Sequence, residues 1–241
     1  MLNKKILFIG GLLLTLPLAS CSVQPGGDEE SSWDITAEKQ EAYDAFKEVI
    51  GDLAKISKVK VTMDYYSGAK DVEEINGTNE YMTQVSEYES LQIWLFVENG
   101  TYYTAHLYDD DEGIGRYYVG KGDYENDFKH YIKILSRFER INLNAYSASF
   151  ENKGESKTVG GVYTGQGTIE ASFAKDQYNF YTYKAQTDGK RVLEIDYKMS
   201  EFNGGSGAPD TSYSCKVTFD YNAEFEFNKP DLTGWKNASG N

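Results

Sequence analysis

Alternation of apolar and polar residues with a period of two restricts the fold of this chain more than any other feature. After residue 58 the alternation recurs in short segments that are separated by turn-forming residues. A two-residue period places successive side chains on opposite faces of a strand, so each segment predicts a strand with one buried face. In the first segment, 59–65, the predicted buried face carries Val59, Val61, Met63 and Tyr65.

The clearest pair of strands covers 91–97 and 102–108, which are joined by Glu98-Asn99-Gly100-Thr101. Asn-Gly between two runs of β-forming residues predicts a tight hairpin, because both residues tolerate a positive φ. The same alternation predicts further strands at 78–86, 116–119, 144–151, 159–164, 167–174, 177–186, 190–202, 212–221 and 223–228.

Two segments have a helical spacing instead. Apolar residues recur every three or four positions over 36–57 and over 124–140, which predicts two amphipathic helices. Strands and helices do not alternate regularly, so a parallel sheet is not expected. The sequence therefore predicts an α+β fold, with one strongly curved antiparallel sheet and helices packed on one face.

The N-terminus has the pattern of an export signal. Lys4 and Lys5 precede an apolar run at 6–19 that is shorter than the roughly 20 residues a membrane-spanning helix needs. The run ends in Leu18-Ala19-Ser20-Cys21, which resembles a bacterial lipobox. That resemblance implies cleavage before Cys21 and its modification with fatty acyl chains such as palmitate. An ordinary signal peptide that ends near a cysteine is the alternative.

These features predict a domain order and a location. Residues 1–20 are the expected signal peptide, 21–33 the acylated cysteine and a flexible linker, 34–236 a single domain and 237–241 a tail. Two acyl chains anchor a protein stably, so the expected location is the outer side of a bacterial membrane, at the cell surface or in the periplasm. Acylation of Cys21 would leave Cys215 unpaired, and strand alternation predicts that Cys215 lies in the core.

The net charge of −14 disfavours binding of this protein to anionic partners. An acidic surface is repelled by phosphate backbones and by anionic lipid headgroups. Nucleic acid is therefore not an expected partner, and the membrane is expected to hold the protein through the lipid anchor alone.

One predicted strand is apolar on both faces. Ile93, Leu95 and Val97 alternate with Trp94 and Phe96. Such a strand is either covered on both sides as the centre of the sheet, or it lines an apolar cavity. The second alternative gives a candidate hydrophobic pocket between sheet and helices, lined by Trp94, Phe96, Phe46, Ile50 and Leu135.

The chain also resembles the LolA/LppX-like superfamily of bacterial lipid-handling proteins and lipoproteins. The shared features are the lipobox, a helix that leads straight into a strand (AYDAFKEVIGDLAKISKVKVTMDYY), the long antiparallel series and the ending VTFDYNAEFEFNKP. The resemblance implies an unclosed half-barrel with helices on its concave face, and a lipid or another hydrophobic ligand between sheet and helices.

The sequence contains no recognisable catalytic, cofactor-binding or metal-binding constellation. His106 and His130 have no zinc-site spacing, and no nucleophile elbow is present. Asp109-Asp110-Asp111-Glu112-Gly113 could attract Ca²⁺, but its spacing does not fit an EF-hand and favours a solvated turn. We therefore expect a protein that is not an enzyme. The alternative to lipid binding is a cell-surface protein that binds glycan or protein through exposed aromatic residues, namely Tyr178, Phe180, Tyr181 and Tyr183.

Overall fold

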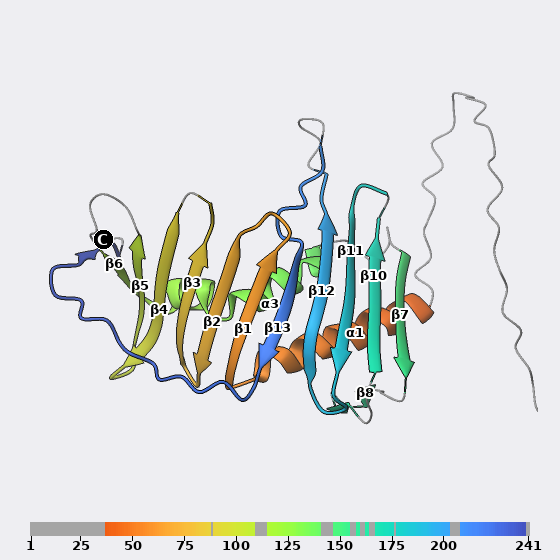
Figure 1. Cartoon of the computed structure of the whole chain (residues 1–241), viewed down its shortest axis with the longest axis horizontal. Coiled ribbons are helices and arrows are strands. Elements are labelled where there is room, and N and C mark those ends of the chain that lie inside the picture. Colours follow the sequence, from red (N-terminus) through yellow and green to blue (C-terminus); the bar gives the residue numbers. More distant parts are fainter. Residues whose placement is uncertain are drawn as a thin grey trace, which may run out of the picture. The chain divides into compact units, whose positions relative to one another are not determined.

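Antiparallel pairing between strands builds one large, curved and unclosed sheet (Figure 1). The computed structural model describes residues 37–87, 89–108, 115–140, 147–154, 158–159, 162–163, 167–175, 177–202 and 208–239, all within the compact unit Trp33–Asn241. In the described part of this sheet eleven strands pair antiparallel, and the short edge strand β14 pairs parallel with β6. The predicted α+β class with a curved antiparallel sheet is confirmed.

The sheet grows in two directions from β1. Strands β2 to β6 follow β1 as consecutive antiparallel neighbours on one side, and on the other side the order is β13-β12-β11-β10-β7. The first arm consists of β1 Lys58–Tyr65, β2 Lys70–Asn76, β3 Asn79–Val85, β4 Ser90–Glu98, β5 Thr101–Tyr108 and β6 Arg116–Val119. The second arm consists of β7 Ser147–Gly154, β10 Gly167–Ala174, β11 Phe180–Thr187, β12 Val192–Ser200 and β13 Cys215–Asp220. The edge strand β14 is Lys236–Asn237, and β8 Thr158–Val159 pairs with β9 Val162–Tyr163 in a separate ribbon.

The helices cover one face of the sheet (Figure 1). They are α1 Ala37–Lys55, α2 Lys121–Asp127, α3 His130–Leu135 and the 3₁₀ turn η1 Arg137–Arg140. The predicted buried face of β1 lies against them, with Val59, Val61 and Met63 at most 1% exposed. Strand β13 alternates in the same way, and Cys215 is buried as predicted.

Aromatic rings fill the space between α1 and the second arm. The ring of Phe46 on α1 lies 4.4 Å from Tyr183, 5.6 Å from Phe173 and 5.4 Å from Phe138. Because close-packed rings leave little free volume, the centre of the helix–sheet interface is a solid core. No helix among the described residues is long and apolar enough to cross a membrane.

Four sequence predictions need correction, one of which is the single strand predicted at 159–164, where the structure has the two paired strands β8 and β9. The second helix, predicted over 124–140, is divided into α2, α3 and η1, because Lys129 adopts a left-handed conformation with φ 53°. Strand β2 was not predicted, because Asp71 and Glu73 occupy its buried face. Residues 223–228 form no strand, although their side chains alternate between half-buried and exposed.

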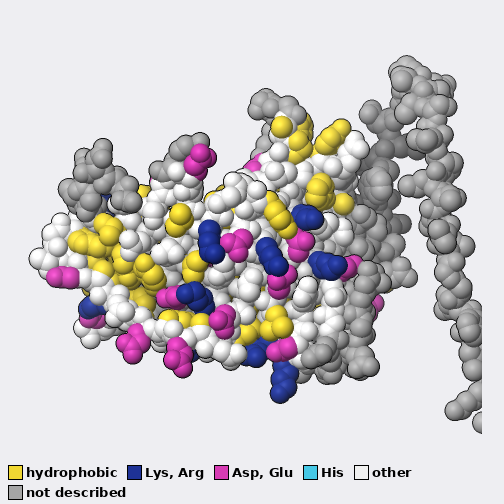
Figure 2. Space-filling view, viewed as in Figure 1, with side chains coloured by type: hydrophobic (Ala, Val, Ile, Leu, Met, Phe, Trp, Pro, Cys, Tyr) yellow, Lys and Arg dark blue, Asp and Glu magenta, His cyan; other side chains and the backbone are white. Residues whose placement is uncertain are grey.

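The opposite face of the sheet is polar in the centre and aromatic at one end. Charged pairs such as Lys60–Glu74 and Lys216–Glu194 cross neighbouring strands (Figure 2). Near β4 the C-terminal segment 222–239 lies on this face, and Figure 2 shows hydrophobic side chains gathered there. The ring of Trp235 lies 5.8 Å from Trp94 in an edge-on contact.

Candidate ligand-binding cavity

The five residues of the predicted hydrophobic pocket do not come together. Phe46, Ile50 and Leu135 belong to the core cluster between helices and sheet. Trp94 and Phe96 lie on the other face, because the alternate residues of β4 pack toward α2. The C-terminal segment covers them through Trp235 and Phe227.

The predicted aromatic row is also divided. Tyr181 and Tyr183 are buried to 2% exposure in the core, whereas Tyr178 is 52% exposed. The predicted acylation site Cys21 and the acidic segment 109–113 lie outside the described residues.

A different cavity of about 380 Å³ opens where α1 ends and the β11–β12 hairpin turns. Its apolar lining comes from the last turns of α1 and from the start of β12, and includes Val49, Leu53, Ile56 and Val192, with Tyr221 beside them. Its charged lining consists of Asp52 and four basic residues, which are Lys55, Lys58, Lys190 and Arg191. The cavity therefore joins an apolar surface to a basic one.

A tight turn presents two of the basic residues. Asp188 accepts hydrogen bonds from the backbone N–H of Lys190 at 2.9 Å and of Arg191 at 2.8 Å. These bonds lower the pKa of Asp188, since they stabilise its charged form. Gly189 has a φ of 91°, which suits glycine at this turn. This turn places Lys190 and Arg191 in the lining of the cavity.

The aromatic ring of Tyr221 supports the basic rim. The guanidinium of Arg191 lies 4.4 Å from the centre of this ring, and the hydroxyl of Tyr221 donates a 2.7 Å hydrogen bond to the carbonyl of Val192. Arg191 also reaches Asp188 at 3.4 Å, and Lys55 pairs with Asp52 at 2.8 Å. Lys58 and Lys190 form no ion pair with another residue of the described ranges.

Three backbone carbonyls at the end of α1 accept hydrogen bonds from side chains of the second helical segment. The ammonium of Lys129 donates to the carbonyls of Ala54 at 2.5 Å and Ile56 at 2.7 Å, and the Tyr131 hydroxyl donates to Leu53 at 2.8 Å. A helix C-terminus otherwise carries partial negative charge. Its neutralisation by Lys129 leaves the basic side chains to dominate the electrostatics of the cavity.

This arrangement suits a ligand with an anionic head and an apolar tail. A carboxylate or phosphate can accept charge-assisted hydrogen bonds from Lys190 and Arg191, and from Lys58 once its ammonium turns from the Phe225 ring, whose centre lies 5.6 Å away. An acyl chain can cover the apolar lining and remove it from water. Sequence reasoning missed the cavity because its basic residues are far apart in the chain, and only the register of the sheet brings them together.

No protein-family model, no curated protein and no solved structure matches this chain.

Proposed function

We propose that this protein is a lipid-anchored extracytoplasmic binding protein that takes up an anionic amphiphile, such as a fatty acid, without catalysing a reaction. One observation carries the proposal: the cavity at the end of α1 combines an apolar lining with four basic residues. In a chain with a net charge of −14, such a concentration of positive charge favours an anionic ligand.

The proposal includes a LolA/LppX-like build. An unclosed antiparallel sheet, helices on one face and a first helix that leads directly into the first strand are compatible with it. The proposed ligand site lies between helix and sheet, as the resemblance implies, but at the end of α1 and not at the centre of the interface. The centre is occupied by Phe46, Phe138 and Tyr183.

A fluorescent fatty acid tests the proposal. We expect 11-(dansylamino)undecanoic acid to bind the Cys21→Ala chain produced without residues 1–20, which carries neither acyl chains nor the apolar run at 6–19, with an emission that shifts to shorter wavelength. The double variant Lys58→Gln/Lys190→Gln should weaken binding by about tenfold or more, because two charge-assisted contacts are lost.

The matched control is Lys60→Gln/Lys216→Gln, which removes two lysines from the opposite, polar face of β1 and β13. This variant changes the net charge equally and should bind the probe like the parent chain. Absence of probe binding, or equal loss in both double variants, would reject the proposed site.

A further inference from the structure

A second cavity of about 490 Å³ lies on the helix side of the sheet, where β1 ends and β2 begins. Tyr65 closes β1, Asp71 and Gln84 are opposite each other on β2 and β3, and Tyr108 ends β5. Tyr213, which precedes β13, completes a set of three tyrosines in the lining. None of these residues belongs to the basic cavity at the end of α1.

Asp71 is the buried polar group of this cavity. It is 5% exposed, and it accepts a 2.9 Å hydrogen bond from the Tyr65 hydroxyl and a 3.3 Å bond from the Gln84 amide. Both donors bind the same oxygen, Oδ2, so Oδ1 accepts no hydrogen bond from the described side chains. Burial raises the pKa of Asp71, and the two hydrogen bonds oppose that shift by stabilising the carboxylate.

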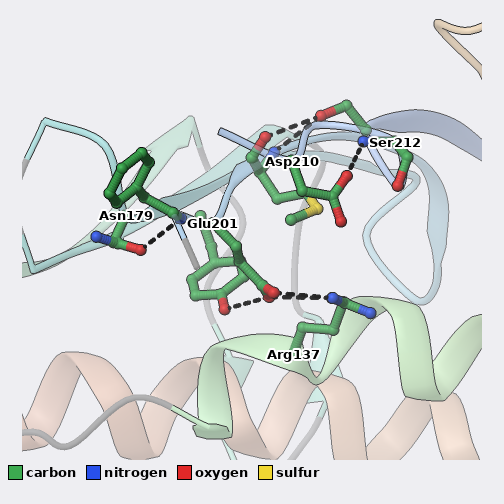
Figure 3. A network of polar contacts seen from close by, with 9 residues as sticks. Arg137, Asn179, Glu201, Asp210 and Ser212 are labelled. Carbon is green, nitrogen blue, oxygen red and sulfur yellow. Dashed lines mark hydrogen bonds and ion pairs between the residues drawn. The ribbon is translucent and has the colours of Figure 1, made fainter. Parts of the chain in front are cut away.

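The ring of Tyr213 is held by an ion pair behind it. The guanidinium of Arg137 lies 4.1 Å from the ring centre and therefore occupies one face. Arg137 donates to both carboxylate oxygens of Glu201, at 3.2 and 3.0 Å, and the Tyr181 hydroxyl donates to Glu201 at 2.7 Å (Figure 3). The charge of Arg137 is thereby balanced, and a planar, bidentate contact fixes its position.

The charge of this lining is opposite to that of the first cavity. Asp71 and Glu89 are the acidic residues of its described lining, which includes neither lysine nor arginine. His130 is the one basic side chain of this described lining, and burial lowers its pKa, which keeps the imidazole neutral at neutral pH. A cation in this cavity would thus face carboxylates and rings.

We propose that this cavity binds an organic ammonium cation. An ammonium group is attracted by the faces of tyrosine rings, and quaternary ammonium ligands are recognised by cages of aromatic rings. The Oδ1 atom of Asp71 supplies the counter-charge, and the acidic surface of the whole protein favours approach of cations. A hard metal ion needs six or more oxygen ligands, and no three acidic, His or Cys side chains converge anywhere in the described ranges.

Calorimetry with choline and its uncharged carbon isostere, 3,3-dimethyl-1-butanol, tests this proposal on the full chain in a non-ionic maltoside detergent. We expect choline to bind at least about tenfold more tightly than the isostere, because only choline carries the charge that rings and carboxylate attract. Asp71→Asn should weaken choline binding by about tenfold or more, while its side-chain oxygen still accepts the Tyr65 hydroxyl.

The control is Asp64→Asn, which removes an exposed acid of β1 that pairs with Lys70. It should leave choline binding unchanged.

A second pair of variants tests whether the ring or the hydroxyl of Tyr213 is needed: Tyr213→Phe should retain choline binding and Tyr213→Leu should lose it. Equal affinity for the isostere, binding of a neutral sugar such as glucose instead of choline, or equal effects of Asp71→Asn and Asp64→Asn would overturn the proposal. The fatty-acid variants Lys58→Gln/Lys190→Gln should bind choline normally, so the two proposals fail independently.

Discussion

At the scale of single residues, a pair of buried carboxyl groups anchors the helices to the sheet. Glu73 accepts the backbone N–H of Tyr131 at 2.8 Å, and Glu80 accepts that of Lys129 at 2.7 Å. Their other oxygens, Oε2 of Glu73 and Oε1 of Glu80, are buried without a further donor among the described residues. One proton shared between the two groups satisfies both oxygens, since a protonated carboxyl donates to a carboxylate.

This pair predicts a pH dependence of stability. Burial raises the pKa of Glu80 to about 7, and burial together with repulsion from Glu80 raises the pKa of Glu73. A raised pKa in the folded state means that the folded state binds more protons than the unfolded state. The contribution of this carboxyl pair to stability is therefore full below the pKa of about 4.3 that Glu has in the unfolded chain. It is lost as the pH rises through the folded-state pKa of Glu80, about 7. Urea unfolding should therefore give a higher free energy of unfolding at pH 5 than at pH 8.

Glu80→Gln should reduce that difference. The Gln oxygen can still accept the Lys129 N–H, and its amide can donate to Glu73 without titrating. We expect the variant to gain roughly 1–3 kcal/mol relative to the parent at pH 8 and little at pH 5, because one pKa unit corresponds to about 1.4 kcal/mol. Glu74→Gln, on the opposite face of β2, controls for net charge. An equal change in Glu80→Gln at both pH values would contradict the shared proton.

At the scale of elements, sequence patterns correctly predicted those helices and turns whose conformation is determined by neighbouring residues in the chain. The Asn99–Gly100 hairpin formed as expected, with φ values of 51° and 78°, because those two residues select the turn by themselves. Strand β2 could not be recognised, since Asp71 and Glu73 break the apolar alternation. Asp71 is compensated by Tyr65 and Gln84 on the neighbouring strands, and Glu73 by the distant backbone N–H of Tyr131. The interruption of the predicted second helix at Lys129 could not be recognised either. The backbone N–H of Lys129 donates to Glu80, which is distant in the sequence, and this contact is not visible in the local pattern.

The segment 223–228 shows what a two-residue period means physically. Phe225 and Phe227 are half-buried and Glu224 and Glu226 are exposed, as in a strand, but the segment has no backbone ladder. Phe227 lies 6.2 Å from Phe96 of β4, so an extended chain rests on the aromatic face of the sheet. Alternation therefore indicates an extended chain on an apolar surface. Alternation alone does not predict that this chain forms hydrogen bonds with a neighbouring strand. The same limit applies to the basic cavity, whose members Lys58 and Lys190 meet only through sheet register.

The C-terminal segment depends on close packing at Gly115. A Cβ atom at this position would overlap the indole ring of Trp235, and the Gly115 carbonyl accepts the N–H of Lys236 at 2.9 Å. Gly115→Ala should therefore displace Trp235 from Trp94 and cost about 1–3 kcal/mol, as overpacking does. We expect a red shift of tryptophan fluorescence and faster proteolysis within 222–239.

Gly122→Ala is the matched control, because a Cβ there meets no atom within 4 Å. This residue lies in α2, where alanine favours the helix by about 0.5–1 kcal/mol over glycine. The control should be as stable as the parent or more so, with unchanged fluorescence. Unchanged proteolysis of 222–239 in Gly115→Ala would mean that Trp235 does not hold the segment.

At the scale of the whole molecule, charge decides how a membrane could hold this protein. The net charge of −14 opposes adsorption to anionic headgroups, although four basic residues gather at one cavity. Within the described ranges no helix can span a bilayer. If acyl chains on Cys21 tether the chain, as we propose, they act without electrostatic assistance, and their loss should release the protein completely.

Cys21→Ala against Cys215→Ala tests this tether, because the two cysteines of the chain differ in every relevant respect. Cys215 is buried in β13, and burial raises the pKa of its thiol to about 12, so it offers no thiolate for acylation. Each buried CH₂ of an acyl chain contributes about 0.8 kcal/mol to membrane binding, so two chains exceed any contact the polar face could make. The comparison is made on protein whose N-terminal sequence shows that residues 1–20, with the apolar run at 6–19, have been removed. In Triton X-114 partitioning, Cys21→Ala should then move from the detergent phase to the aqueous phase at every salt concentration, and Cys215→Ala should stay in the detergent phase. Retention of Cys21→Ala in the detergent phase would show that another part of the chain binds the membrane, and would remove the lipid anchor from the proposed function.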